Sequence, residues 1–365
     1  MENKKDKMVT DKLKTVGEEL LKQIDKGQNP TYELPVRTLN NIFFDEKSGT
    51  IKLGDKMSER QFLNAAHSRK FMQTVLVANE IIKVIEQDAT VSIRDLYYAL
   101  KHTIPGTQEN TFEEQEESDP LVEDIEASLD LLREELHLSA SSKGVIAGDF
   151  KIKDGTTTID LTKMGSGGWG IPSNVEPDKL DIKDVDAEYV LFIEKDAVWK
   201  RFNEDLFWKK NKCIILTGRG QPARAERRMA QRLNKEFKLP VYCLMDADPY
   251  GMYIYSVIKR GSISLSYSEE KLTTPDAKYI GLTISDVDEF KIPKEVTIKL
   301  TAEDTKRLQE MKKYEWFKKK EWQKEFDLMK ERNYKLELEA LSKKGIRYIT
   351  EEYLPRKIKD KNFLP

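Results

Sequence analysis

The chain of 365 residues is long enough for two or three domains, each with a core of its own. Its 62 basic and 64 acidic side chains leave a net charge of -2, which neither indicates nor excludes a nucleic-acid partner. No apolar stretch approaches the length of a membrane span, and the Lys- and Glu-rich start lacks a signal-peptide core, so we expect a soluble protein. The two cysteines, Cys213 and Cys243, lack metal-ligand spacing, and we expect them to lie in the reducing cytoplasm.

The first 60 residues are predicted to form an arm rather than a domain. A charged, helix-like start is followed there by prolines and short alternating stretches such as residues 50–53. A helical block is expected from residue 59 to about residue 138. Within it, the acidic residues crowded between Glu109 and Glu135 indicate a solvated or linker face, to which we assign no chemistry.

Residues 92–102 are predicted to form an amphipathic helix whose two adjacent tyrosines face different ways. Ser92, with an acid three residues later, is a plausible N-terminal cap. The apolar residues recur at helical spacing and include Tyr97, which therefore belongs to the core. Tyr98 falls on another face, one turn from Arg94 and beside further cationic groups.

Tyr98 is the candidate nucleophile of this helix. A free tyrosine ionises at about pH 10 and is a poor nucleophile at neutral pH. A nearby arginine favours the phenolate and can also hold a phosphate with two hydrogen bonds, which makes Arg94 the candidate phosphate ligand. On this segment alone, an ordinary surface tyrosine on an amphipathic helix is the more common interpretation.

The glycines of residues 165–170 formally match the dinucleotide-binding pattern Gly-x-Gly-x-x-Gly. That pattern requires a helix that starts at the glycines. Here Ile171-Pro172-Ser173 follows, which favours an extended chain or a turn. We therefore expect a structural loop, near the active site or at a dimer contact, rather than a nucleotide site.

From Gly144 onward strands and helices alternate, which favours an α/β fold with a parallel sheet and helices on both faces. One apolar run ends in Glu194, and a second, further along, ends in Asp246 and Asp248. Ligands bind outside the carboxyl ends of such strands, and oxygen-only ligands suit Mg²⁺ that keeps several waters. These acids are candidate Mg²⁺ ligands, although each alone is as often a helix N-cap.

Two basic stretches, residues 219–238 and 306–320, are candidates for contact with DNA phosphates. The second is at least as often a solvated amphipathic helix whose aromatic residues pack on the core. Residues 307–339 are expected to form a long, highly charged helical stretch. The histidines lack metal-ligand spacing and are expected to be structural or surface residues: His67, His102 and His137.

Several segments together resemble one family. They are Arg94-Asp-Leu-Tyr-Tyr98, residues 164–173, Phe192-Ile-Glu-Lys-Asp-Ala197, Gly220-Gln-Pro followed by Arg227, and Asp246-Ala-Asp-Pro-Tyr-Gly251. The order and spacing of these segments resemble those of the A subunit of DNA topoisomerase VI and its relatives that make meiotic double-strand breaks. The resemblance extends over most of the chain. The resemblance implies an N-terminal, partner-docking arm (residues 1–60), a winged-helix domain with the tyrosine (61–143) and an α/β Toprim domain with the metal site and a C-terminal extension (144–365).

The resemblance also implies a division of chemical roles. Tyr98 would attack a DNA phosphodiester to give a 5′-phosphotyrosyl link and a 3′-hydroxyl that later reverses the step. Arg94 would hold the scissile phosphate, and Arg227 would assist from the Toprim side. The Mg²⁺ of the carboxylate edge would neutralise charge on the phosphoryl oxygens and the leaving hydroxyl. Whether Glu194 is a metal ligand or the general acid–base stays open.

Several partners follow from the same resemblance. In the relatives the tyrosine of one protomer works with the metal site of the other, which implies a homodimer acting on double-stranded DNA. The chain has no Gly-x-x-x-x-Gly-Lys-Ser/Thr loop, so another polypeptide must use ATP. We expect that partner to be a B subunit with a GHKL-type ATPase in an A2B2 assembly, which relaxes and decatenates DNA at the nucleoid.

Two other classes of function remain open. One is a break-forming homologue outside any ATP-driven topoisomerase, or a Toprim nuclease that hydrolyses DNA without a covalent step. The other is a non-catalytic winged-helix DNA-binding module on a degenerate Toprim scaffold. The joint presence of Tyr98, Glu194, Asp246 and Asp248 weighs against the last, and residues 164–173 resemble the archaeal topoisomerase subunits more than the meiotic proteins.

Overall fold

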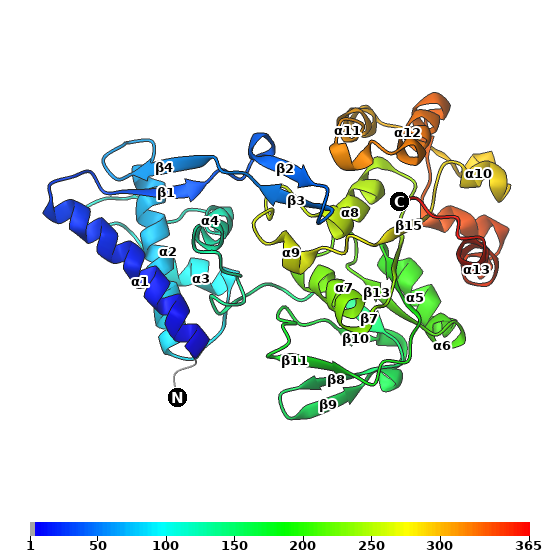
Figure 1. Cartoon of the computed structure of the whole chain (residues 1–365), viewed down its shortest axis with the longest axis horizontal. Coiled ribbons are helices and arrows are strands. Elements are labelled where there is room, and N and C mark those ends of the chain that lie inside the picture. The colour runs from blue at the N-terminus through cyan, green and yellow to red at the C-terminus, as the bar shows by residue number, and fades with distance from the viewer. Residues whose placement is uncertain (1–3) are drawn as a thin grey trace. The chain divides into compact units, whose positions relative to one another are not determined.

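The computed structural model describes residues 4–365, which divide into two compact units (Figure 1). The first unit takes in the described chain up to Phe43, together with Ile51–Ser141 and Ile263–Ser268. The second consists of Phe44–Thr50, Ser142–Ser262 and Glu269–Pro365. Across the described residues, no helix combines the length and the apolar character that crossing a membrane requires.

The first unit is largely helical. Its elements are α1 (Lys4–Asp25), β1 (Thr31–Pro35), β4 (Met57–Gln61), α2 (Ser68–Glu86), β5 (Val91–Ser92), α3 (Ile93–Leu100), α4 (Asp119–Leu129) and β6 (Leu138–Ser139). Strands β1 and β4 pair antiparallel, and β5 pairs parallel with β6. A two-stranded hairpin of β2 (Ile42–Asp45) and β3 (Thr50–Leu53) belongs partly to each unit.

Helix α1 is part of the first unit's core rather than a separate arm. Val9 and Leu13, one turn apart on α1, are buried in the same cluster as Val77 of α2 and Leu96 of α3. An amphipathic helix needs a partner for its apolar stripe, and α2 supplies it here. The compact units therefore do not follow the division at residue 60 that the sequence suggested.

The acidic run that the sequence suggested to be a solvated face is partly buried. Asp124 on α4 is 6% exposed and forms ion pairs with Arg37, at 2.7 Å, and with Arg60. Glu126 is fully buried and accepts a hydrogen bond of 2.6 Å from the backbone N–H of Arg133. Buried carboxylates require such partners, and the arginines that pair with Asp124 lie far away in the sequence.

The second unit is built on a six-stranded sheet with the order β10-β7-β13-β12-β14-β15. Its strands are β7 (Val145–Ala147), β10 (Trp169–Gly170), β12 (Tyr189–Ile193), β13 (Cys213–Thr217), β14 (Val241–Leu244) and β15 (Lys278–Gly281). The last four are parallel, as predicted, whereas β7 and β10 form an antiparallel edge. The alternation of strands and helices expected from Gly144 onward begins only at β12. Before it, β8 (Lys151–Asp154), β9 (Thr157–Asp160) and β11 (Leu180–Lys183) form a separate antiparallel sheet.

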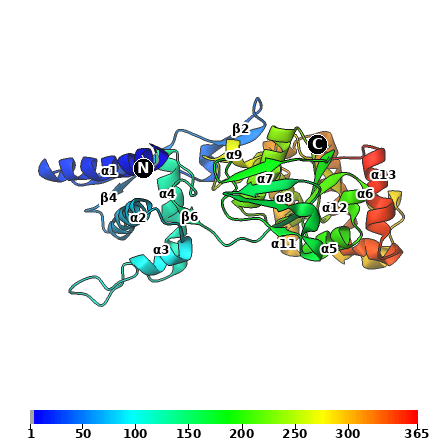
Figure 2. The same ribbon diagram turned by 90° about the horizontal axis from the view of Figure 1, so that it is seen from below.

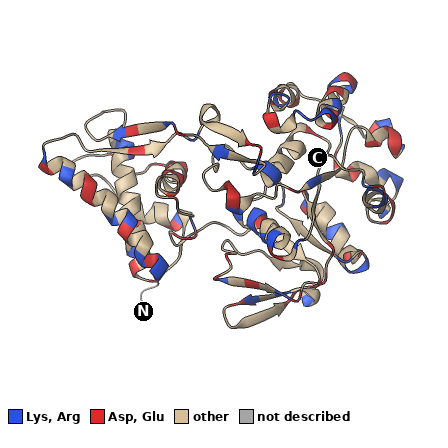
Figure 3. Ribbon diagram, viewed as in Figure 1, with Lys and Arg blue, Asp and Glu red and all other residues tan. Residues whose placement is uncertain are grey.

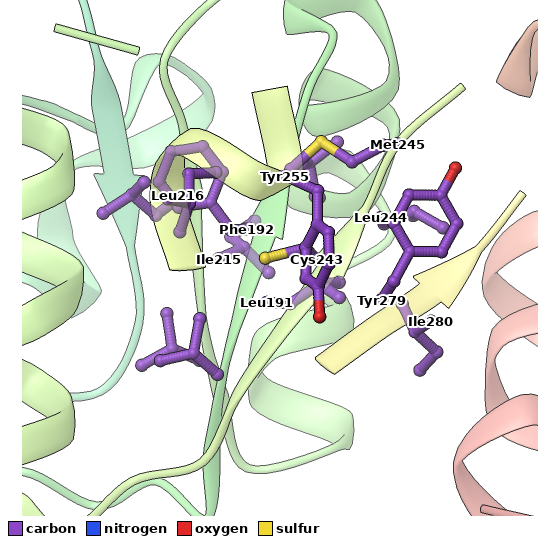
Figure 4. Packing of buried hydrophobic residues seen from close by; sticks show 14 of the residues in the cluster. Leu191, Phe192, Ile215, Leu216, Cys243, Leu244, Met245, Tyr255, Tyr279 and Ile280 are labelled. Carbon is purple, nitrogen blue, oxygen red and sulfur yellow. The ribbon is translucent and has the colours of Figure 1, made fainter. Parts of the chain in front are cut away.

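The helices that follow these strands cover both faces of the sheet. They are α5 (Asp196–Glu204), α6 (Phe207–Lys210), α7 (Arg224–Phe237), α8 (Pro249–Arg260) and α9 (Glu269–Leu272). The chain runs from β12 to β13 in one direction and from β13 to β14 in the other, so right-handed crossovers put α5 and α7 on opposite faces, as Figures 1 and 2 show. Phe192, Leu216, Cys243 and Tyr279 pack together beneath these helices (Figure 4), and both cysteines are buried and free.

The C-terminal part consists of short elements rather than one long helix. They are α10 (Asp286–Glu289), β16 (Ile298–Lys299), α11 (Ala302–Met311), α12 (Lys320–Arg332), β17 (Tyr334–Lys335) and α13 (Leu354–Lys359). The stretch expected at residues 307–339 is broken after Met311 and again at Asn333, which adopts a left-handed conformation. Between the two helices, Phe317 is buried against Trp322 and Phe326. The aromatic residues of the basic stretch at residues 306–320 thus pack on the core, Phe317 within it and Tyr314 and Trp316 against it, although the helix expected there ends at Met311.

Candidate active site

Helix α3 buries one of its two tyrosines and exposes the other, as the helical period predicted. Ser92 and Asp95 form a reciprocal capping box that fixes where the helix begins. Tyr97 is 6% exposed, and its hydroxyl donates a hydrogen bond of 2.8 Å to the carbonyl of Glu113. Tyr98 is 60% exposed. The phenol of Tyr98 is thus the one that can reach a substrate.

Arg94 accompanies Tyr98 on the exposed face of α3. Its guanidinium carbon lies 6.0 Å from the centre of the Tyr98 ring. Within residues 4–365, no carboxylate oxygen lies within ion-pair distance of the Arg94 guanidinium. An unpaired guanidinium one turn from a phenol can hold a phosphate while the phenol oxygen approaches phosphorus.

The acids predicted at the strand ends meet at the switch point of the sheet. Strands β12 and β14 are neighbours, with Ile193 opposite Leu244, so the residues that follow them lie side by side. The Oε2 atom of Glu194 accepts a hydrogen bond of 2.9 Å from the backbone N–H of Asp246. Asp248 is the N-cap of α8. Glu194 and Asp246 lie far apart in the sequence, and the parallel sheet brings them into contact.

Gly251 allows this close approach. A Cβ atom at this position would lie 2.7 Å from the carbonyl oxygen of Asp246 and 2.9 Å from Oε2 of Glu194, distances that real side chains do not adopt. The N–H of Gly251 also donates a hydrogen bond of 2.6 Å to Asp248. The glycine that ends the Asp-x-Asp segment is therefore required by the geometry of the acids.

Lys195 is a site residue that we did not predict from the sequence. Its Nζ atom lies 2.9 Å from Oδ2 of Asp246, and it also contacts Glu337 at 3.0 Å and Glu339 at 2.7 Å. It follows Glu194 directly in the sequence, and that position was the only signal available there. Lys195 places one positive charge among the carboxylates.

The carboxylates at this edge are held in surroundings that favour their protonated forms. Burial, together with the charges of Asp246 and Asp248, raises the pKa of Glu194 to about 8. Burial also raises the pKa of Asp246 to about 6, although the N–H of Leu338 and the charge of Lys195 oppose the shift. The pKa of Asp248 is raised as well, again mainly by burial. The surroundings of this edge therefore do not stabilise three ionised carboxylates at once.

Such a set of acids suits a hard divalent cation. All its donors are oxygen atoms, and a bound cation would favour the charged forms of carboxyls whose pKa values are raised mainly by burial. Among the described side chains, no three His, Cys, Asp or Glu residues are gathered closely enough to hold an ion by themselves. Mg²⁺ rarely uses such a cage, because it is usually held by one or two carboxylates, waters and substrate phosphates. The residues thus fit Mg²⁺ bound together with a phosphate.

We predict that Glu194→Gln stabilises the metal-free protein at alkaline pH. A carboxyl whose pKa is raised on folding, here from 4.5 to about 8, binds more protons in the folded state, so stability falls as pH rises through this range. The glutamine amide carries no charge, and its oxygen still accepts the hydrogen bond from the N–H of Asp246. At pH 8.5 in EDTA we expect Glu194→Gln to raise the free energy of unfolding by an amount on the order of a few kcal/mol, visible as a higher melting temperature. Below about pH 4 we expect no difference from the wild type.

The exposed Glu188, directly before β12, provides the control. Glu188→Gln makes the same chemical change and should leave the melting temperature unchanged at both pH values. A Glu194→Gln variant whose melting curve tracks that of Glu188→Gln across the pH range would disprove the charge accumulation at this edge.

Arg227 and its basic neighbours on α7 are engaged within the second unit. Arg227 is 2% exposed and forms an ion pair with the buried Glu269. Arg228 pairs with Glu176 at 2.7 Å. Figure 3 shows the basic residues of this helix. A buried, paired arginine is not available to DNA, so this position favours a structural role for Arg227 over the direct assistance that the resemblance implied.

The glycine loop at residues 165–170 lies against α5. The side-chain amide of Asn203 donates hydrogen bonds to the carbonyls of Gly165 and Ser166, at 3.1 and 3.0 Å. At Gly168, whose φ is +64°, a Cβ atom would lie 2.5 Å from the ring of Trp199. The glycines thus allow the loop to approach α5 closely, which explains the pattern without a nucleotide.

Three family descriptions match consecutive parts of the chain. "Type IIB DNA topoisomerase" matches residues 69–138, which include Tyr98. "All-beta domain in DNA topoisomerase VI alpha subunit" matches residues 143–186, where the antiparallel sheet lies. The Toprim domain shared by Spo11 and the topoisomerase 6 A subunit matches residues 189–358, which hold the carboxylate edge. The matches together span most of the chain.

Curated proteins are similar over nearly the whole length. The A subunit of type 2 DNA topoisomerase 6 from Pyrococcus abyssi is 44% identical, with 98% of this chain and 95% of that protein covered. The protein of the same name from Hyperthermus butylicus is 46% identical over 93% of this chain and 92% of its own. The A subunit of DNA topoisomerase 6 from Arabidopsis thaliana is 35% identical, and the match covers 98% of this chain and 81% of that protein.

Proposed function

The chain belongs to the family of topoisomerase VI A subunits within the type IIB DNA topoisomerases, and on that premise we propose that it is the subunit that cleaves and rejoins DNA in an ATP-dependent enzyme. The observation that carries the proposal is the exposed phenol of Tyr98, fixed on a capped helix beside the unpaired Arg94. The carboxylate edge of the second unit supplies the complementary site. We assign the first unit's helices and short strands to the winged-helix arrangement of the family.

In the proposed reaction Tyr98 acts as the nucleophile. Its phenol oxygen bonds to the phosphorus of a phosphodiester, the bond from phosphorus to the 3′ oxygen breaks, and the phenol proton is lost as the 3′ oxygen gains one. The product is a 5′-phosphotyrosyl link and a free 3′-hydroxyl, which reverses the step by attacking the same phosphorus. Arg94 holds the phosphate throughout.

We propose that Glu194, Asp246 and Asp248 hold Mg²⁺ during cleavage. When bound, the ion stabilises negative charge on the phosphoryl and leaving oxygens. In the alternative arrangement, Asp246 and Asp248 hold the ion and Glu194 instead exchanges a proton with the 3′ oxygen. Lys195 keeps Asp246 oriented through their ion pair of 2.9 Å.

We further propose that two copies of the chain act on opposite strands, the tyrosine of each working with the carboxylate edge of the other. A GHKL-type ATPase partner would complete an A2B2 assembly that relaxes and decatenates DNA in the cytoplasm. Double-strand breaks for strand passage need both active sites, which a homodimer provides.

We propose that α1 contributes to docking this ATPase partner. Leu21 and Ile24 on α1 are 61% and 54% exposed, and a largely apolar pocket of about 490 Å³ lies between α1, α2 and α4. Exposed apolar side chains beside such a pocket are typical of a protein interface. We expect Leu21→Glu to weaken association with the ATPase partner by at least about tenfold in calorimetry. Unchanged affinity would exclude this face of α1 from the interface, and the fold should not suffer because Leu21 lies outside the core.

The proposed function is tested with the complete system. The chain is mixed with its ATPase partner, supercoiled DNA, Mg²⁺ and ATP, and the topoisomers are followed on a gel. We expect relaxation that requires all components, and detergent-trapped linear DNA when a non-hydrolysable ATP analogue is used. Linear DNA that appears without protein attached to its ends would indicate a hydrolytic nuclease and disprove the proposal.

A further inference from the structure

Arg307 on α11 is held against two tyrosines of α8, and no step of the proposed reaction uses it. Its guanidinium carbon lies 5.5 Å from the ring centre of Tyr250 and 5.4 Å from that of Tyr253. Since Tyr250 and Tyr253 are one turn apart on the same helix face, the arginine spans both rings. Stacking on aromatic faces fixes the plane of a guanidinium and leaves its N–H edge free for an anion.

The charge of Arg307 has no counter-ion in the described part of the chain. Asp304, one turn earlier on α11, pairs with Lys335 at 2.8 Å instead. Glu303 and Glu310, the other acids within one turn, lie beyond ion-pair distance from Arg307 and are exposed. The arginines of α7 differ, because Arg227 and Arg228 are neutralised by buried or half-buried carboxylates. A partly buried, fixed and uncompensated cation is a site for an anion.

The position of this pair relative to the carboxylate edge indicates which anion it meets. Helix α8 begins directly after Asp248, its N-cap, and Tyr250 lies in its first turn with 43% of its surface exposed. Tyr250 and Arg307 therefore border the edge at which Glu194 and Asp246 meet. A DNA strand whose scissile phosphate reaches those carboxylates passes a second phosphate close to this border, because phosphates recur at every nucleotide.

We propose that Arg307 and Tyr250 form a binding site for the DNA backbone beside the cleavage position. Arg307 holds a phosphate other than the scissile one, and the exposed ring of Tyr250 packs against the adjoining deoxyribose. The site reads no base edge, so it acts on any sequence and positions the strand. This inference rests on the proposed function, since DNA is taken to be the substrate.

The test compares two charge-removing substitutions in the same unit. Binding of the full-length chain to a fluorescent duplex is measured by anisotropy over a series of salt concentrations, for Arg307→Gln and for Lys330→Gln. Lys330 is exposed on α12, outside the basic stretch of residues 306–320, and serves as the matched control. We expect Arg307→Gln to lower affinity about tenfold and to reduce the salt slope by about one, and Lys330→Gln to change affinity less than about twofold. Equal affinities and slopes for the two variants would overturn the inference.

A second pair of variants guards against misfolding. If Arg307→Gln lowers the melting temperature, Tyr250→Ala is compared with Tyr250→Phe, because this ring lies outside the core. We expect the alanine variant to bind DNA about three- to tenfold more weakly than the phenylalanine variant, and no difference would overturn the inference. The failure of this inference can be distinguished from the failure of the proposed function. If the proposed function is wrong, the wild-type chain binds DNA but forms no covalent link through Tyr98.

Discussion

Replacing Tyr98 by phenylalanine is expected to abolish DNA cleavage while leaving the fold and DNA binding unchanged. The substitution removes only the phenolic oxygen, which is the nucleophile of the proposed reaction. The ring is 60% exposed, so no core packing is lost. In the presence of the ATPase partner, Mg²⁺ and an ATP analogue, detergent-trapped breaks should fall at least about a thousandfold, because no other group takes over the covalent step.

Tyr97→Phe is the matched control for this prediction. It removes the same atom from the neighbouring residue, whose hydroxyl is tied to the carbonyl of Glu113 within the core. This variant should melt at a slightly lower temperature and should still cleave DNA. Cleavage that survives in Tyr98→Phe, or that is lost equally in both variants, would remove Tyr98 from the role of nucleophile.

Asp246→Asn is expected to lower cleavage about a hundred- to ten-thousandfold, with no recovery at high Mg²⁺. The asparagine keeps the shape of the side chain but loses the charge that would attract the cation and that pairs with Lys195 at 2.9 Å. DNA binding should change little, and the break assay used for Tyr98 measures the effect. Asp178→Asn, at an exposed aspartate of the same unit, should cleave like the wild type.

Mixing the Tyr98→Phe and Asp246→Asn chains tests whether the active site is shared between protomers. Each variant alone lacks one component in both sites. In a mixed dimer, a site built from two protomers would combine the intact tyrosine of one chain with the intact carboxylates of the other, so single-strand nicking should return. A mixture as inactive as its components would show that each protomer supplies both components of its own site.

The sequence predicted features whose determinants lie close together along the chain. The capping residues and helical period of α3 are local, and they separated the buried Tyr97 from the exposed Tyr98. The strand ends at Glu194 and Asp246 were likewise marked by apolar runs, and the parallel sheet then brought them together. Periodicity and strand termination depend on the residues themselves, which is why they could be predicted.

Pairings between residues far apart in the sequence could not be predicted. The acids of α4 resembled a solvated face because their partners, such as Arg37 for Asp124, lie outside any local window. Helix α1 resembled part of an arm because its sequence is highly charged and prolines follow it, yet its buried residues pack against α2. The basic run of α7 suggested a DNA contact, but the burial of Arg227 against Glu269 depends on how the second unit packs. Tertiary structure, rather than local pattern, decides whether a charge is solvated or paired.

The central claim is that Tyr98 becomes covalently linked to DNA. The most direct measurement mixes the chain with its ATPase partner, supercoiled DNA, Mg²⁺ and an ATP analogue, stops the reaction with detergent, digests both polymers and identifies nucleotide-bearing peptides by mass spectrometry. We predict a nucleotide attached through its 5′-phosphate to the peptide that contains Tyr98, and no such peptide from Tyr98→Phe. Linear DNA with a free 5′-phosphate and no modified peptide would contradict the claim and point to hydrolysis instead.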